Sequence, residues 1–216
     1  MIQRFCLLVA AALLIGSCMS TRKELQTGDL LFVAIPADYQ LDSTSMDSAI
    51  AASTSQSLRL IHTAIVEVRG DSTWVIDATI KRGVARYPLQ EFLQDFTLKD
   101  GSLPVLMVKR LKQPYDVEDF VARAKTFIGQ PYDVAFLPDN DAMYCTELVR
   151  ESYRPDGTGW LFPNKPMNFH NEDGTYPPYW EQLFALLEMP IPQGVMGTNP
   201  EEMSKSGLLR DIEIAF

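Results

Sequence analysis

The sequence is poor in metal-binding residues and in positive charge. Three cysteines and two histidines among 216 residues leave little material for a structural metal centre, and we expect neither a metal nor another cofactor. Lysine and arginine number 19 against 28 aspartate and glutamate residues, which gives a formal net charge of −9. Because a nucleic-acid binder needs a cationic face to displace counterions from phosphate, this balance argues against such a partner.

What is present is the composition of an ordinary globular domain. Hydrophobic residues make up 46% of the chain and charged residues 22%, which fits neither a disordered nor a fibrous protein. The length suits one domain with an appendix, and we find no internal repeat and no interdomain linker. We therefore predict a single domain over residues 28–216, with 155–216 as a C-terminal extension.

The amino terminus has the layout of a secretory signal. One arginine precedes an apolar run over residues 5–15, and small residues follow before Cys18. The apolar run is too short to cross a bilayer comfortably as a permanent helix. Residues 14–18 (LIGSC) resemble a bacterial lipobox, in which the cysteine is lipidated and the signal is cut before it. A plain secretory signal with an incidental Cys18 is the alternative.

These features predict a protein of the cell envelope. Residues 1–17 would be removed, residues 18–27 would form a tether, and Cys18 would carry the lipid. Met19 gives no inner-membrane retention signal of the Asp type, which favours the outer membrane, facing the periplasm. Cys145 is then the only thiol of the mature chain, so it cannot form an internal disulfide. A lone exported thiol is either a small buried hydrophobe or a reactive group.

Hydrophobic patterning predicts strands first and helices later. Short β-prone runs predict strands over residues 30–35, 62–68, 73–78, 83–87 and 104–111. Helical spacing and start signals predict helices over residues 45–55, from Pro88 onward, and over 117–128, 145–153, 180–187 and 200–206. This order of elements is typical of an α+β fold with an antiparallel sheet.

Cys145 lies in the first turn of one of these predicted helices. Unpaired backbone N–H groups and the helix dipole favour an anion there, so the thiol should ionise readily. The same N–H groups can donate to an oxyanion formed on an attacked carbonyl. Glu147, one turn into the helix, modestly opposes the thiolate, and we interpret it mainly as a first-turn helix charge. An inert, packed Cys145 is the alternative.

His62 and Asp77 lie on neighbouring strands of a predicted hairpin. Strand alternation places His62 on one face with Ala64 and Val66, and Asp77 on one face with Val75. A carboxylate beside the imidazole would fix its tautomer, and a buried carboxylate without a partner is expensive. Cysteine, histidine and carboxylate together supply a nucleophile, a base and an orienting group.

These segments resemble the YiiX/YaeF-like family of permuted papain-fold amidases, relatives of the NlpC-type cell-wall cysteine peptidases. The matching segments run in family order: residues 28–32 (GDLLF), 62–66 (HTAIV), 75–78 (VIDA), 88–89 (PL), 129–133 (GQPYD) and 144–149 (YCTELV). They lie within residues 27–153, about three fifths of the chain. In this family the histidine strand precedes the cysteine helix, the reverse of ordinary papain-like enzymes, and the present chain has this order.

The resemblance implies a permuted papain-like fold in which an antiparallel sheet packs against a helix that carries the nucleophile. It implies Cys145 as the nucleophile, His62 as the base and Asp77 as the third member of the triad. The family position of the third member commonly carries glutamate, so the shorter Asp77 changes the reach to His62.

Other residues near the nucleophile are weaker candidates. Tyr132 and Tyr144 could donate to the oxyanion or line the cleft, although aromatic packing would also account for both. His170 is interpreted as a surface or structural residue, because Cys145, His62 and His170 lack the spacing of a zinc site. Aromatic residues of the tail are expected to cover the domain or to form a wall of the cleft.

Together these features predict a lipid-anchored thiol hydrolase that cleaves an amide of the cell envelope, in a peptidoglycan peptide or a lipid. Two alternatives stay open. The permuted fold is similar to that of the lecithin:retinol acyltransferases, in which a Cys/His pair moves acyl groups between lipids. A non-catalytic binding lipoprotein on the same scaffold is the other. The sequence does not predict an oligomeric state.

Overall fold

The computed structural model of the chain describes residues 24–157 and 159–216. The predicted signal peptide and Cys18 lie outside these residues, as does most of the predicted tether. Within the described ranges, no helix is both long enough and apolar enough to span a bilayer.

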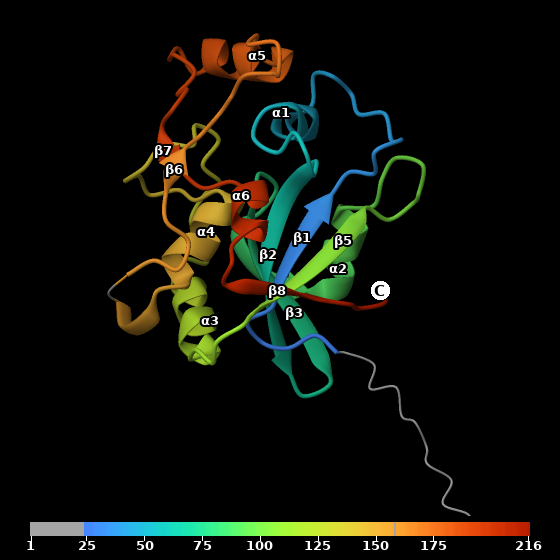
Figure 1. The fold of residues 1–216 in the computed structure, drawn as a ribbon, viewed down its shortest axis with the longest axis vertical. Coiled ribbons are helices and arrows are strands. Elements are labelled where there is room, and N and C mark those ends of the chain that lie inside the picture. The colour runs from blue at the N-terminus through green and yellow to red at the C-terminus, as the bar shows by residue number, and fades with distance from the viewer. Residues whose placement is uncertain (1–23, 158) are drawn as a thin grey trace, which may run out of the picture.

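A six-stranded antiparallel sheet forms the centre of the fold (Figure 1). Its strand order is β4-β3-β2-β1-β5-β8. The strands are β1 (Leu30–Ala34), β2 (Leu60–Arg69), β3 (Ser72–Thr79), β4 (Gly83–Pro88), β5 (Val105–Leu111) and β8 (Leu209–Ile212). The first five agree closely with the predicted strands, and the α+β fold class is confirmed. The strand β8 was not predicted.

The predicted helices are all present. They are α1 (Met46–Ala52), α2 (Leu89–Asp95), α3 (Val117–Thr126), α4 (Cys145–Ser152), α5 (Pro178–Leu186) and α6 (Pro200–Ser204). A short 3-10 turn (Pro155–Gly157) follows α4. Pro88 ends β4 and caps α2 instead of opening the helix, because its extended backbone conformation continues the strand.

Both faces of the sheet are covered. In β1, Leu30 and Phe32 pack with α3 and α4, while Leu31 and Val33 pack with α1, α2 and α5 on the opposite face. All five residues of β1 are buried. An uninterrupted apolar run is what a strand buried on both faces requires, since successive side chains point to opposite sides.

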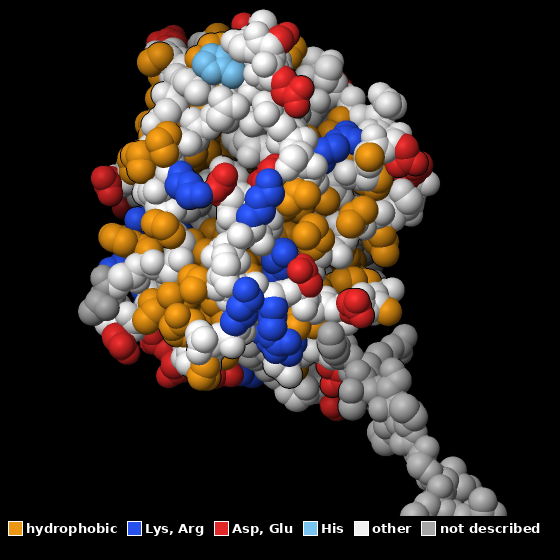
Figure 2. Space-filling view, in the orientation of Figure 1, with side chains coloured by type: hydrophobic (Ala, Val, Ile, Leu, Met, Phe, Trp, Pro, Cys, Tyr) orange, Lys and Arg blue, Asp and Glu red, His pale blue; other side chains and the backbone are white. Residues whose placement is uncertain are grey.

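The C-terminal extension is built into this fold. Its last strand, β8, pairs with β5, and Lys109 meets Asp211 directly opposite at 2.7 Å. Figure 2 shows basic and acidic side chains interspersed with hydrophobic ones on this side of the molecule. Earlier in the extension, β6 (Lys165–Pro166) pairs with β7 (Met196–Gly197). From β7 the chain leads into α6, which packs against β2 (Figure 1).

Candidate active site

The β2–β3 hairpin brings His62 and Asp77 together. The strands pair antiparallel with Val66 opposite Val75. Two residues further along β3 in this register, Asp77 lies diagonally across from His62. His62 Nε2 lies 2.8 Å from Asp77 Oδ2. The imidazole N–H therefore donates to the carboxylate, and this contact fixes the ring with its other nitrogen free for a second partner.

Tyr87 on β4 is a further member of this group, and the sequence analysis missed it. Its hydroxyl donates to the same Asp77 Oδ2 at 2.8 Å, while no described residue hydrogen-bonds Asp77 Oδ1. The signal was available, because Asp77 pairs with Ala85 and Val75 with Tyr87. Alternation along the strand predicted over residues 83–87 thus places Tyr87 on the face that carries Asp77.

Cys145 is the first residue of α4, as predicted. The N-cap residue is Tyr144, and its own side chain makes no capping hydrogen bond, so the N–H groups of the first turn remain available to an acceptor. The Cys145 side chain lies beside the His62 imidazole and interacts with it electrostatically. The structure therefore joins Cys145, His62 and Asp77 in one chain of contacts, with Cys145 only 5% and His62 only 6% exposed.

The His62 imidazole is strongly basic in this setting. Burial by itself would lower its pKa, but the charge on Cys145 and the hydrogen bond to Asp77 outweigh burial and raise the pKa to about 10. The rings of Phe92 and Phe96 lie 6.1 and 4.8 Å from the imidazole. This apolar cover keeps the electrostatic contacts of the imidazole in a medium of low dielectric constant, where they are stronger than in water.

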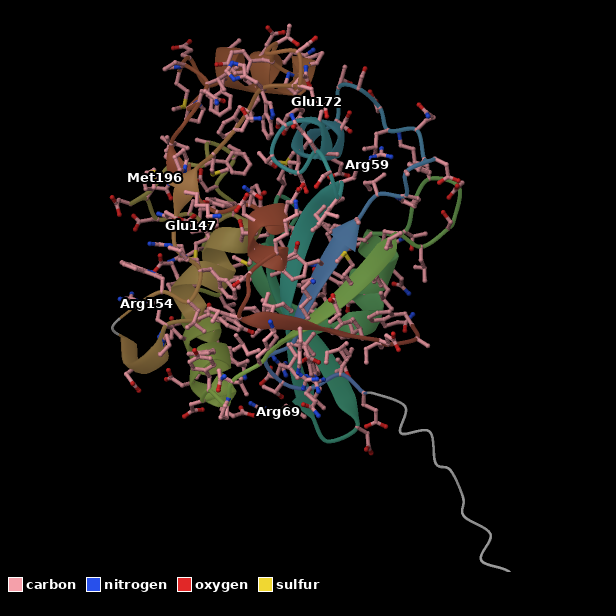
Figure 3. All side chains as sticks on the ribbon, viewed as in Figure 1. Arg59, Arg69, Glu147, Arg154, Glu172 and Met196 are labelled. Atoms are coloured by element: carbon pink, nitrogen blue, oxygen red, sulfur yellow. The ribbon has the colours of Figure 1, made fainter. Side chains whose placement is uncertain are left out.

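Glu147 adjoins the nucleophile and is less charged than the sequence analysis assumed. Burial, followed by the nearby charge of Asp133, raises its pKa to about 8. The backbone N–H of Tyr144 donates to it, which is half of a capping box. Figure 3 labels Glu147 on the first turn of α4. At neutral pH it is mostly protonated and opposes a Cys145 thiolate only weakly.

Cys145 opens on a narrow pocket of about 20 Å³, which has room for about one water molecule. Most of its lining is apolar or aromatic, and the aromatic members are Tyr132, Phe136, Tyr144, Phe169 and Trp180. The predicted tail aromatics thus contribute both to the core and to this pocket.

The two predicted tyrosines both line the pocket but use their hydroxyls differently. The Tyr144 hydroxyl accepts the Thr198 N–H at 3.0 Å and lies 3.9 Å from Met167 Sδ. Tyr132 is held beside Cys145 by a β-bridge to Met143. Burial and the Cys145 charge raise the pKa of Tyr132 well above its ordinary value, so its hydroxyl stays a donor.

His170 lies apart from the triad and stacks on Tyr176 at 4.2 Å between ring centroids. Over residues 24–157 and 159–216, no three His, Cys, Asp or Glu side chains gather closely enough to hold a metal ion.

Comparison with known proteins identifies the family of the chain. Residues 24–213 match the family described as "Permuted papain-like amidase enzyme, YaeF/YiiX, C92 family". The chain is 28% identical over 133 residues to the uncharacterized protein YiiX of Escherichia coli strain K12, covering 60% of this chain and 57% of that relative. The chain thus spans less than two thirds of the relative's length.

A solved structure shares the fold. The crystal structure of metalloprotein yiiX from Escherichia coli O157:H7 superposes with a TM-score of 0.67 at 22% identity, covering 88% of this chain and 98% of that one. The description as a metalloprotein applies to that protein. Since the family match covers most of its length, the chain belongs to the permuted papain-like amidase family of YaeF and YiiX.

Proposed function

We propose that this member of the family is a thiol amidase that works through Cys145, His62 and Asp77. The observation that carries the proposal is the continuous series of contacts from Cys145 through His62 to Asp77 and Tyr87. A nucleophile, a base and an orienting carboxylate in contact are the parts that covalent acyl transfer requires.

In the first half of the reaction, Cys145 Sγ attacks the amide carbonyl carbon and a C–S bond forms. The negative charge that develops on the carbonyl oxygen is stabilised by N–H groups of the first turn of α4 and by the Tyr132 hydroxyl. His62 gives its proton to the leaving nitrogen, the C–N bond breaks, and a thioester remains on Cys145.

In the second half, water attacks the thioester carbonyl while His62 takes a proton from it. The C–S bond breaks, the acid product leaves, and the proton on His62 restores the starting pair with Cys145. Asp77 holds the ring in position throughout and stabilises its protonated form. The Tyr87 hydroxyl in turn holds the Asp77 carboxylate.

The proposed substrate is an amide of the cell envelope, in a peptidoglycan peptide or a lipid. The proposed location is the outer membrane, facing the periplasm, through a lipid on Cys18. The lipobox-like segment at residues 14–18 supports the anchor. The apolar lining of the Cys145 pocket favours a second candidate as well, in which a lipid replaces water as the acyl acceptor.

Incubation of the full chain with peptidoglycan and, separately, with phospholipid vesicles tests both candidates. Mass spectrometry reads the adduct on Cys145 and the released products, with Cys145→Ala as the control. Release of stem-peptide fragments supports the amidase, whereas acylated Cys145 and transferred acyl chains support the lipid acyltransferase. Equal product from the wild type and Cys145→Ala would exclude Cys145 as the nucleophile.

The anchor is tested separately by fractionation of cells that express Cys18→Ala. The wild type should sediment with the outer membrane, and the variant should appear in the soluble periplasmic fraction. Retention of the variant in the membrane to the wild-type extent would contradict lipidation at Cys18.

A further inference from the structure

The C-terminal extension places Thr198 against the first turn of the nucleophile helix. Its backbone N–H donates to the Tyr144 hydroxyl at 3.0 Å, and its carbonyl accepts from Thr146 Oγ1 at 3.0 Å. Tyr144 and Thr146 are the residues on either side of Cys145. Both backbone groups of Thr198 are therefore tied to the chain segment that presents the sulfur.

The residue before Thr198 is closely packed, which leaves Thr198 little freedom to move. A Cβ atom added to Gly197 would lie 2.3 Å from Met167 Sδ and 2.7 Å from the Tyr144 hydroxyl oxygen. The backbone at Gly197 therefore lies close to both side chains, and a larger residue would displace them. Thr198 is thus held in a fixed place over the start of the helix.

The Thr198 hydroxyl lies near the Tyr144 hydroxyl but makes no well-formed hydrogen bond to it or to another described residue, although Thr198 is only 6% exposed. Buried hydroxyl groups are normally hydrogen-bonded, and an exception requires an explanation. Thr198 lines the same pocket as Cys145. A polar group left unpaired beside a nucleophile is explained if a bound substrate supplies the partner.

We propose that Thr198 Oγ1 donates a hydrogen bond to the carbonyl oxygen of the bound substrate, and a stronger one to the oxyanion formed from it. This inference rests on the proposed function of Cys145 as an acyl-accepting nucleophile. Thr198 then complements the N–H groups of α4, so that the C-terminal extension supplies a catalytic group. Only a donor that strengthens its contact in the transition state accelerates the reaction.

Two reactions of Cys145 test the proposal on the full chain. With p-nitrophenyl acetate, the sulfur attacks a carbonyl, an oxyanion forms, p-nitrophenolate leaves and Cys145 becomes acetylated. With iodoacetamide, the sulfur displaces iodide and no oxyanion forms. Mass spectrometry of the peptide that contains Cys145 measures both rates without interference from Cys6 and Cys18.

Thr198→Val removes the hydroxyl and keeps the shape of the side chain, whereas Thr198→Ser keeps the hydroxyl. We expect Thr198→Val to lower the acetylation rate by about tenfold or more and to leave alkylation unchanged, while Thr198→Ser keeps both rates. The melting temperature of Thr198→Val should stay equal or rise, because a buried unpaired hydroxyl is removed. If Thr198→Val does not fold, Thr198→Ala gives the same comparison.

A buried hydroxyl at the far end of α4 serves as the control. Ser152 Oγ donates to the Leu148 carbonyl oxygen, and Ser152→Ala should leave both rates unchanged. Acetylation of Thr198→Val at the wild-type rate would overturn the inference while the proposed function stands. An equal loss of both rates would also overturn the inference, because Thr198 would then affect only the access of the reagents to Cys145. A wild-type Cys145 that neither acetylates nor alkylates would overturn both proposals.

Discussion

At the scale of single residues, the site depends on a carboxylate that is fully buried. Asp77 has no exposed surface and accepts hydrogen bonds from His62 and Tyr87 on a single oxygen. The opposite strand position is occupied by Ala85, whose small side chain leaves space around the carboxylate. Asp77 Oδ2 lies 2.8 Å from His62 Nε2, so the side chain of an aspartate is long enough for this contact.

The protonation of His62 should depend on Cys145. In Cys145→Ala, the thiolate charge that raises the His62 pKa is lost, whereas burial still lowers the His62 pKa. The His62 pKa should therefore fall below the wild-type value of about 10. The chain has two histidines, and NMR titration of their ring protons resolves both. His170 serves as the internal control and should titrate identically in both proteins. If the His62 pKa is unchanged in the variant, Cys145 does not influence the charge of the imidazole and the prediction is wrong.

Tyr87 is expected to act through Asp77 as a positioning residue. Tyr87→Phe removes the hydroxyl that holds the carboxylate but keeps the ring, which packs under Arg82. We expect kcat to fall by about three- to tenfold with little change in KM, because a single hydrogen bond contributes about 1 kcal/mol. The His62 pKa should shift as well, which a purely structural role would not cause.

Tyr153→Phe is the matched control for Tyr87→Phe. Tyr153 is also buried, and its hydroxyl donates to the Gly28 carbonyl oxygen at 3.0 Å, outside the triad. This variant should lose about 1 kcal/mol of unfolding free energy and keep its kcat. If the two variants lose the same activity, the role assigned to Tyr87 is wrong.

At the scale of elements, the start of α4 is stabilised by a protonated side chain. Glu147 has a pKa of about 8 in the folded protein against 4.5 ordinarily, so the folded state binds more protons between these pH values. Its contribution to the unfolding free energy is therefore greatest below about pH 4.5 and declines as the pH rises through 8. Glu147→Gln keeps the acceptor for the Tyr144 N–H and removes this dependence.

Urea denaturation at pH 5, 6.5 and 8 measures the effect. The difference in unfolding free energy, Glu147→Gln minus wild type, should become more positive from pH 5 to pH 8. Glu202→Gln is the control, since Glu202 is an exposed acidic residue in the first turn of α6. A difference for Glu147→Gln that stays constant with pH would contradict the assignment.

The loop that carries Tyr132 is fixed to β4 through Gly83. Val84 N–H donates to the Gln130 carbonyl at 2.8 Å, and Gly129 N–H donates to the Val84 carbonyl at 2.9 Å. A Cβ on Gly83 would lie 2.3 Å from the Gln130 oxygen, and the φ angle of +64° is already unfavourable for other residues. The approach of this loop to β4 therefore requires glycine.

Gly83→Ala should accordingly lower the unfolding free energy by about 2 kcal/mol or more, since backbone strain and a clash add together. Gly70→Ala is the control, because Gly70 also has a positive φ of +56° but no atoms within 4 Å of its added Cβ. It should lose only about 1 kcal/mol. If both variants lose the same unfolding free energy in urea denaturation, the close contact at Gly83 is not the cause of the destabilisation.

At the scale of the whole molecule, the parts predicted from the sequence are those that local pattern determines. The strand of His62 and the helix start at Cys145 each follow from a few neighbouring residues, and the β2–β3 turn sets the register that joins His62 to Asp77. The contact between Cys145 and His62 was predicted from the family resemblance, because neither segment indicates it by itself.

What the sequence analysis missed depends on contacts between distant segments. The strand β8 has only four residues, two of them charged, and forms because β5 offers a free edge. Thr198 lies 53 positions beyond Cys145 and reaches it through hydrogen bonds to Tyr144 and Thr146. Neither a short polar strand nor a single threonine carries a local signal of such a position.

The central claim is that Cys145 and His62 act as one nucleophilic pair, and the pH dependence of Cys145 alkylation by iodoacetamide tests it most directly. Native wild-type protein should label Cys145 readily at pH 6, where an ordinary cysteine with a pKa of about 8.5 reacts slowly, and His62→Gln should lose this reactivity. If native Cys145 labels no faster at pH 6 than in the denatured chain, or if His62→Gln labels at the wild-type rate, the account is contradicted.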